Sequence, residues 1–116
     1  MRKAMWSAAA VVVLLSLGGM AAVRAAGTTV SMVEGPGDPT KDWRFDPADI
    51  TVPAGSTVTW HNSGQQPHTV TADDGSFDSG VKTGMGLRWD HRFDQPGDYP
   101  YSCTPHPTMT GVVHVR

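Results

Sequence analysis

The chain contains a single cysteine, Cys103, so it cannot form a disulfide bond within itself. In an oxidising compartment, a lone thiol implies either pairing between two molecules or a special chemical role. The ordinary alternative is a small buried side chain that packs like any other apolar residue. The residues around Cys103 decide between these interpretations, and they favour a chemical role.

Basic side chains are also scarce. Residues 26–116 hold six lysines and arginines against eleven aspartates and glutamates, a formal net charge of −5 (6 − 11). This balance argues against a nucleic-acid-binding protein, which would carry a basic face. It is compatible with a partner attracted by charge, although most of the acidic residues lie in turns, where solubility alone explains them.

Helical periodicity is absent from residues 26–116, where apolar and polar side chains alternate in short segments between turn residues. The alternating segments are 28–33, 48–52, 56–62, 68–78, 87–93, 99–103 and 110–116. Two of the faces that alternation predicts are Leu87, Trp89, His91 and Phe93 in one segment, and Tyr99, Tyr101 and Cys103 in another. Short strands at this spacing predict an all-β fold, a Greek-key β-sandwich of about seven or eight strands.

Residues 26–116 are expected to form one small domain. Within it, 26–42 supply an N-terminal strand and a linker loop, because 34–42 (EGPGDPTKD) is rich in turn residues. Residues 43–116 supply the core of the domain. By alternation, Cys103 points inward at the end of its strand, beneath the loop that follows, at one end of the sandwich.

The first 25 residues have the three parts of a secretory signal peptide. MRK is basic, 4–23 are uncharged, and VRAAG offers the small residues of a cleavage site, which we place after Ala25 or one residue later. An uncleaved membrane anchor is the alternative, since about 20 uncharged residues just span a bilayer. The cleavage-like end favours the signal peptide, and no cysteine near it could carry a lipid. We therefore expect export to the periplasm or the outer cell surface, without membrane insertion after cleavage.

Three side chains that bind soft metals lie within seven residues, in Cys103-Thr-Pro-His106-Pro-Thr-Met109. A thiolate and two imidazoles in a trigonal set, with a weak methionine sulfur, form the ligand set of a blue copper electron-transfer site. The second imidazole must come from elsewhere, and His68 in QQPHTV is the best candidate. The sequence therefore predicts one copper ion bound by His68, Cys103, His106 and Met109.

Two prolines flank His106 in this loop. Pro105 and Pro107 fix φ on both sides of the histidine and so restrict the loop. Pro105 also has no amide hydrogen to donate to the sulfur of Cys103, and hydrogen bonding at that sulfur influences the reduction potential. We therefore expect Pro105 to act on the metal through the loop, not as a ligand.

The remaining candidates for metal binding have simpler explanations. His61 falls on a predicted strand and is expected at the surface or within the sheet, His91 to be half-buried and hydrogen-bonded, and His114 to face solvent. Met32 and Met85 are expected in the core or at the surface. Asp73-Asp74-Gly75 could bind a hard cation, but the same residues make a good hairpin turn.

Together these segments resemble the cupredoxins, the small type I copper proteins of the plastocyanin/azurin family, and within that family the amicyanin branch most of all. The likeness covers nearly all of residues 45–116. It rests on FDPADITVPAGSTVTWHN, PHTV, FDSG, PGDYPYSC, the Cys-x-x-His-x-x-Met spacing with its Cys-Thr-Pro-His-Pro core, and GVVHV. As a combination, these motifs are highly specific.

The resemblance implies a mobile carrier of one electron, not an enzyme. Its copper would cycle between Cu(II) and Cu(I), electrons would leave through the ring of His106, and redox proteins would dock transiently nearby. We expect the carrier to be a monomer. The resemblance also makes Asn62 a residue that holds the ligand loop by hydrogen bonds. Two positions depart from the pattern: Thr69, where amicyanins often carry asparagine, and Thr108, where a bulkier apolar residue is common.

A second interpretation uses the same ligands. A copper carrier or buffer, which delivers the metal to another exported protein, could bind copper in the same way. Such proteins more often show open clusters of additional Met and His, which this sequence lacks. A copper oxidase or nitrite reductase is disfavoured, because these enzymes need further copper centres, commonly with His-x-His pairs, and the chain has no such pair.

Overall fold

The computed structural model describes residues 27–116, and the expected signal peptide, residues 1–25, lies outside them. Within the described residues there are eight strands and no helix, which confirms the all-β prediction. The strands are β1 (Thr28–Val33), β2 (Arg44–Asp46), β3 (Asp49–Val52), β4 (Ser56–Asn62), β5 (Thr71–Ala72), β6 (Arg88–Phe93), β7 (Gly97–Ser102) and β8 (Thr110–Val115). None of residues 27–116 belongs to a helix that could cross a membrane.

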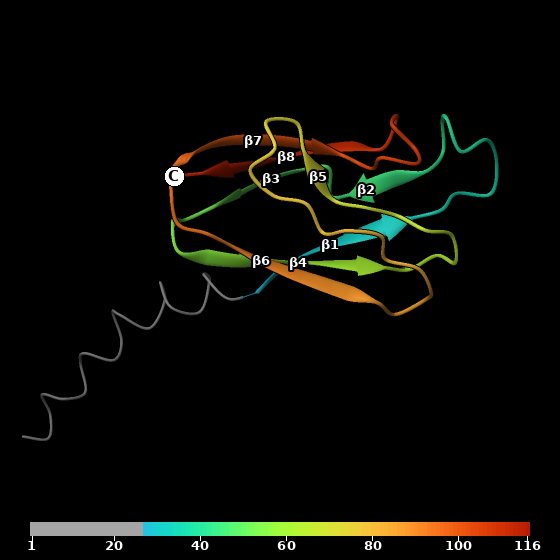
Figure 1. Ribbon diagram of the computed structural model, residues 1–116, viewed down its shortest axis with the longest axis horizontal. Helices are drawn as coiled ribbons and strands as arrows, with labels where there is room; N and C mark the ends of the chain where they lie inside the picture. Colours follow the sequence, from blue (N-terminus) through green and yellow to red (C-terminus); the bar gives the residue numbers. More distant parts are fainter. Residues whose placement is uncertain (1–26) are drawn as a thin grey trace, which may run out of the picture.

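These strands form two four-stranded sheets that pack face to face (Figure 1). The strand order is β2-β1-β4-β6 in one sheet and β3-β8-β7-β5 in the other. β1 runs parallel to β4 and β3 parallel to β8, while the other neighbours are antiparallel. Most connections between consecutive strands therefore cross from one sheet to the other, as in a Greek-key sandwich.

Alternation along each strand decides which side chains enter the core. In β4, Val58 and Trp60 are fully buried, whereas the residues that alternate with them, Thr57, Thr59 and His61, are only partly covered. The indole Nε1 of Trp60 donates a hydrogen bond of 3.2 Å to the hydroxyl of Tyr101 on β7, in the opposite sheet. The polar group of this large buried ring is thus satisfied across the core, and the two sheets are joined at the same point.

β1 belongs to the same core as residues 43–116. It is hydrogen-bonded to β2 on one edge and to β4 on the other, and its side chains Val30 and Met32 are fully buried. The chain leaves the sheet only after Val33. Residues 34–43 then form a loop at the end of the sandwich opposite the C-terminus (Figure 1).

Of the four residues predicted to share one face of the segment 87–93, the first, Leu87, is not part of the strand. β6 begins at Arg88, and Leu87 lies in the preceding turn, where its amide donates to the carbonyl of Gly84 at 3.3 Å. Leu87 is consequently 44% exposed and lies outside β6, so its assignment to one strand face with Trp89, His91 and Phe93 was wrong. Trp89, His91 and Phe93 do share the inward-facing side of β6.

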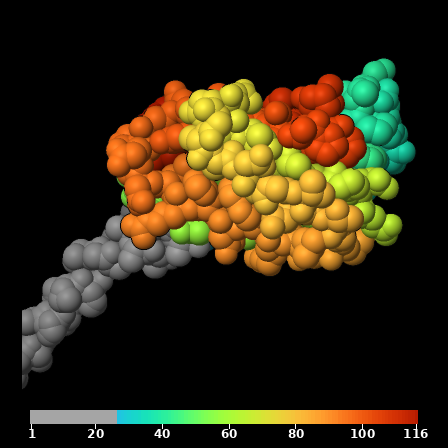
Figure 2. Space-filling view, in the orientation of Figure 1, coloured from blue at the N-terminus to red at the C-terminus, as the bar shows by residue number. Residues whose placement is uncertain are grey.

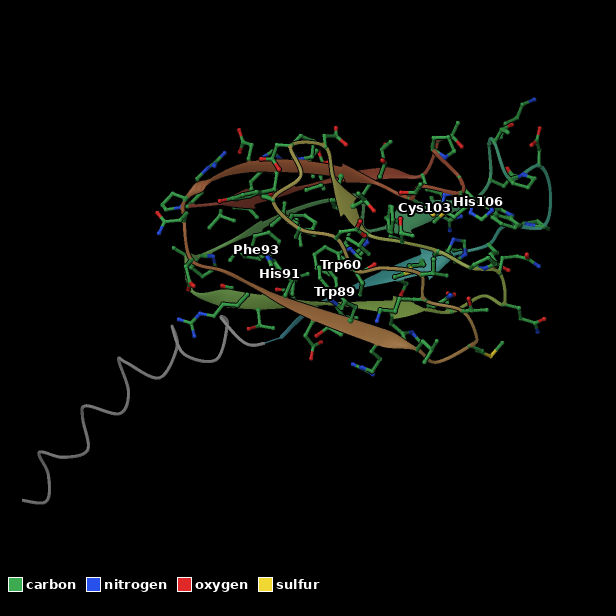
Figure 3. All side chains as sticks on the ribbon, viewed as in Figure 1. Trp60, Trp89, His91, Phe93, Cys103 and His106 are labelled. Atoms are coloured by element: carbon green, nitrogen blue, oxygen red, sulfur yellow. The ribbon has the colours of Figure 1, made fainter. Side chains whose placement is uncertain are left out.

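His91 is half-buried as predicted, but its described neighbours are aromatic rings, not hydrogen-bond partners. Its ring stacks on Trp89 at a centroid distance of 5.2 Å and an angle of 15°, and it lies 4.8 Å from Phe93 (Figure 3). Burial lowers the pKa of His91, with nearby Asp94 opposing the shift. The histidine therefore packs as a neutral ring.

The segment 68–78 forms less strand than its alternation predicts. β5 has only two residues, and the returning half makes a single bridge between Thr71 and Asp78. The side chain of Ser79 accepts a hydrogen bond from the amide of Val70 at 2.8 Å, so a side chain replaces one bond of the ladder. The turn at Asp73-Asp74-Gly75 is confirmed, and Gly75 adopts a φ of 80° there.

Candidate metal centre

Cys103 lies directly after β7, and its side chain is fully buried, as alternation predicts. Its amide donates to the carbonyl of Met109 at 3.0 Å, which closes the loop just before β8 begins. Inside the loop, the amide of His106 donates to the Cys103 carbonyl at 3.2 Å, and the amide of Met109 donates to the His106 carbonyl at 2.9 Å. Two successive turns thus hold three candidate ligands on a short, closed loop.

His68 reaches the same place from the segment between β4 and β5. Its backbone pairs with that of Lys82 through two hydrogen bonds of 3.1 and 2.8 Å, which fix the position of the ring. His68 Nδ1 lies 3.6 Å from the sulfur of Cys103, and His106 Nδ1 lies at the same distance from it. One donor atom from each of these three side chains lies within 4.8 Å of the others. Figure 3 shows Cys103 and His106 at the end of the sandwich away from the C-terminus.

The arrangement fits a single transition-metal ion. Bonds from such an ion are roughly 2.0 Å to imidazole nitrogen and 2.3 Å to thiolate sulfur, so two of these donors on one ion lie at most about 4.3 Å apart. Both sulfur–nitrogen separations of 3.6 Å meet this condition. Met109 is fully buried in the same loop. The four side chains predicted from the sequence are therefore positioned to bind one ion.

Burial differs among these side chains. His68, Cys103 and Met109 are fully buried, whereas His106 is partly exposed. Burial lowers the pKa of the His106 ring, and the neighbouring His68 lowers it further, while Glu34 opposes the shift. The neutral form that can donate a lone pair to a metal is thereby favoured.

A carboxylate holds the far side of the His68 ring. Glu34 Oε2 lies 2.9 Å from His68 Nε2, and the carboxylate also accepts the amides of Gln66 at 2.7 Å and Gln65 at 3.1 Å. Burial raises the pKa of Glu34, but the hydrogen bonds from Gln66, Gln65 and His68 outweigh it, so the pKa lies below its ordinary value. Since a carboxylate only accepts, His68 Nε2 carries the proton and the lone pair of Nδ1 faces Cys103.

Asn62 is buried beside this ligand and fixes the loop that leads to it. Its side-chain amide donates to the carbonyls of Lys82 at 2.9 Å and Gln66 at 3.1 Å, and its side-chain oxygen accepts from the amide of Gly64 at 2.9 Å. The loop that Asn62 holds is therefore the one before His68. These bonds do not reach residues 103–109.

Thr69 connects the two ligand-bearing segments. Its amide donates to the sulfur of Cys103 at 3.4 Å, and its hydroxyl accepts the amide of Thr104 at 2.8 Å. The threonine at this position, a departure from the amicyanin pattern, thus still joins the segments. Pro105 has no amide hydrogen to donate, and the backbone hydrogen bond to the sulfur comes from Thr69, outside the 103–109 loop.

The segment 34–43 lies against the partly exposed histidine. The ring of Trp43 contacts that of His106 edge-on, with centroids 4.8 Å apart, and lies 5.8 Å from that of His68. The hydroxyl of Thr108 donates to the carbonyl of Pro39 at 3.4 Å. In Figure 2 the 103–109 loop (red) and the 35–42 segment (teal) lie side by side at one end of the molecule. One side of His106 is therefore covered.

Among the described residues, neither His61 nor His114 belongs to the group of side chains that could hold a metal ion. His61 lies on β4 and is half-buried, and His114 on β8 pairs with Asp98 at 2.8 Å. Met32 is fully buried in the core, whereas Met85 is 68% exposed.

Sequence reasoning missed two residues of this site, Glu34 and Trp43. Both lie in or beside the turn-rich segment, where no motif spacing singles them out. Glu34 is the only glutamate among the eleven acidic residues, and this is the one signal that could have drawn attention to it. Its contact with His68 joins residues 34 positions apart, which only the fold brings together.

Among residues 27–116, one buried thiol and two imidazoles converge at one end of a two-sheet sandwich, an arrangement typical of small proteins with a metal centre. The family model of the copper-binding proteins of the plastocyanin/azurin family matches residues 30–116, and the chain belongs to this family. Its cofactor is copper.

Amicyanin-alpha of Methylorubrum extorquens is 35% identical over 103 residues, which cover 82% of this chain and 87% of that protein. A purple cupredoxin from Nitrosopumilus maritimus has the same fold, with a TM-score of 0.68 and 30% identity over 78% of this chain and 100% of the other. A copper-containing nitrite reductase from Thermus scotoductus matches 77% of this chain with a TM-score of 0.64 and 27% identity, but the match spans only 22% of the enzyme.

Proposed function

We propose that this protein is an exported carrier of single electrons. Copper is held by His68, Cys103, His106 and Met109, and electrons pass through His106. The observation that carries this proposal is the convergence of a buried thiol with two imidazole nitrogens at 3.6 Å each. The likeness to amicyanin-alpha over most of both chains supports it.

Bound copper would supply a reversible Cu(II)/Cu(I) couple. The chain contributes a rigid and dry set of ligands: the loop hydrogen bonds preset Cys103, His106 and Met109, and full burial of His68 keeps water from its side of the site. A site that is already organised needs little rearrangement when its charge changes. His106, the partly exposed ligand, offers the shortest path to a partner.

Docking is expected at the copper end, around Pro67, His106, Pro107 and Thr108. Both Pro107 and Thr108 are exposed, and a small contact there suits a transient redox complex. The partners would be redox proteins that donate and accept one electron. Export is supported by the basic, apolar and small-residue parts of residues 1–25.

Copper loading followed by redox cycling tests this function. With Cu(II), the protein should bind one ion per chain and show the intense visible band of a thiolate–copper bond, which should return after each cycle of reduction and reoxidation. The Cys103→Ser variant keeps the size of the side chain and should lose the band. Ready transfer of Cu(I) from the wild-type protein to a chelator would favour the delivery or buffer role, and absence of the band would contradict both.

A further inference from the structure

Glu34 differs from the other acidic residues in its contact with the site. Its side chain is 17% exposed, and it lies 2.9 Å from the Nε2 of a fully buried histidine. Two backbone amides, of Gln65 and Gln66, hold the carboxylate in this position. Because three donors converge on it, the carboxylate cannot turn away without leaving polar hydrogens unpaired.

The negative charge of Glu34 has no lysine or arginine partner within 4.0 Å among residues 27–116, and its side-chain partner there is Nε2 of His68. A carboxylate that accepts the Nε2 proton makes the imidazole a stronger electron donor at Nδ1. Nδ1 is the atom that faces the sulfur of Cys103 at 3.6 Å. The charge of Glu34 is thus transmitted to the place where the metal binds.

The second histidine has a different environment. The ring of His106 packs edge-on against Trp43 at 4.8 Å, and its Nδ1 faces Cys103. No carboxylate among the described residues pairs with this ring within 4.0 Å. The two imidazoles are therefore unequal: one is fixed and made electron-rich by a carboxylate, and the other is partly exposed.

We propose that Glu34 is a positioning residue that sets the reduction potential of the centre, by stabilising Cu(II) relative to Cu(I) through its hydrogen bond to His68. This inference rests on the proposed function. The step it affects is the uptake of one electron, given by a reduced redox protein, by Cu(II) to form Cu(I). The carboxylate favours the more positive ion, so the potential lies lower than it would with a neutral group at this position.

The test replaces Glu34 by glutamine, which has the same shape and retains one oxygen that can accept the proton of His68. Loss of an outer partner of a metal ligand typically changes metal affinity by about 10-fold. We expect Glu34→Gln to weaken Cu(II) binding about 10-fold more than Cu(I) binding, which raises the potential by about 59 mV. The readouts are voltammetry of the copper-loaded protein and competition with chelators for each oxidation state.

The matched control is Asp42→Asn. It removes the same charge from the same loop, but the side chain of Asp42 does not hydrogen-bond to His68, so its potential should shift much less. If both variants shift the potential equally, or Glu34→Gln leaves it unchanged, the proposal is overturned. Failure of the function itself would look different, because the wild-type protein would then lack the reversible couple altogether.

A measurement on the wild-type protein keeps the proposal testable should the variant not fold. The proton on His68 Nε2 is buried against Glu34, so NMR of the Cu(I) form should show a downfield, slowly exchanging ring proton for this histidine. Rapid exchange of that proton with solvent would overturn the proposal.

Discussion

Thr69 forms hydrogen bonds to the ligand loop through two groups, its amide and its hydroxyl. The amide reaches the sulfur of Cys103 at 3.4 Å, and the hydroxyl accepts the amide of Thr104 at 2.8 Å. Thr69 is itself only 5% exposed. Its hydroxyl therefore replaces water as the acceptor for a backbone group in the ligand loop.

Thr69→Ala should destabilise the copper-free protein by about 1–3 kcal/mol, because the amide of Thr104 loses its acceptor. Denaturant unfolding monitored by tryptophan fluorescence measures the change. Thr69→Ser keeps the hydroxyl and should recover most of the stability. An equal loss in both variants would mean that the methyl group, not the hydroxyl, accounts for the effect.

At the scale of elements, the composition of the loop 103–109 influences which hydrogen-bond donors are available to the sulfur of Cys103. Pro105 leaves this loop without one amide hydrogen, and the hydrogen bond that the sulfur receives comes from Thr69 at 3.4 Å. A second donor from within the loop would withdraw electron density from the thiolate and favour Cu(I).

Pro105→Ala should therefore raise the reduction potential, provided that the new amide turns toward the sulfur. Voltammetry of the copper-loaded variant and wild type gives the shift, and the position of the thiolate–copper band reports on the same bond. A lower potential, or no change, would count against this explanation.

β8 illustrates how closely the elements approach beneath the site. A Cβ atom at Gly111 would lie 2.5 Å from the ring and hydroxyl of Tyr101 and 2.7 Å from the carbonyl of Ala48. Since Tyr101 is buried and hydrogen-bonded to Trp60, its ring has little room to move.

Gly111→Ala should destabilise the protein by about 1–3 kcal/mol through overpacking. The midpoint of denaturant unfolding measures this loss. Gly27→Ala is the matched control, since a Cβ there has no atom within 4 Å and should leave the midpoint nearly unchanged. Equal midpoints for the two variants would show that the structure around Gly111 shifts enough to accommodate the added methyl group without loss of stability.

The long strands could be predicted because their side chains alternate strictly, as in β4, where Val58 and Trp60 enter the core. The candidate ligands could be picked out because three of them lie on one short loop, where residue type and spacing carry the chemistry. Glu34 could not, because its role arises from a contact 34 residues away in sequence. The short β5 also escaped prediction, since Ser79 replaces a backbone partner of Val70.

At the scale of the whole molecule, the two ends of the sandwich differ. The candidate ligands gather at one end, next to the 34–43 loop, while the C-terminus and the turn between β6 and β7 lie at the other (Figures 1 and 3). Residues 26–116 carry a formal net charge of −5 (6 − 11). Two copies meeting through their copper ends would therefore repel each other modestly.

Thr108→Glu tests whether electrons leave at this end. An added negative charge beside His106 should slow electron self-exchange between Cu(I) and Cu(II) copies, and added salt should relieve the effect. Line broadening in NMR spectra of mixed oxidation states measures the rate. Gln95→Glu adds the same charge to the exposed turn at the opposite end and should have little influence. Equal rates for Thr108→Glu and wild type would indicate another exit.

X-ray absorption at the copper edge is the most direct check on the copper site itself. In both the Cu(II) and the Cu(I) protein, we expect two nitrogen scatterers and one short sulfur scatterer, assigned to His68, His106 and Cys103, with little change between the two states. A copper ion surrounded only by nitrogen and oxygen would contradict this assignment.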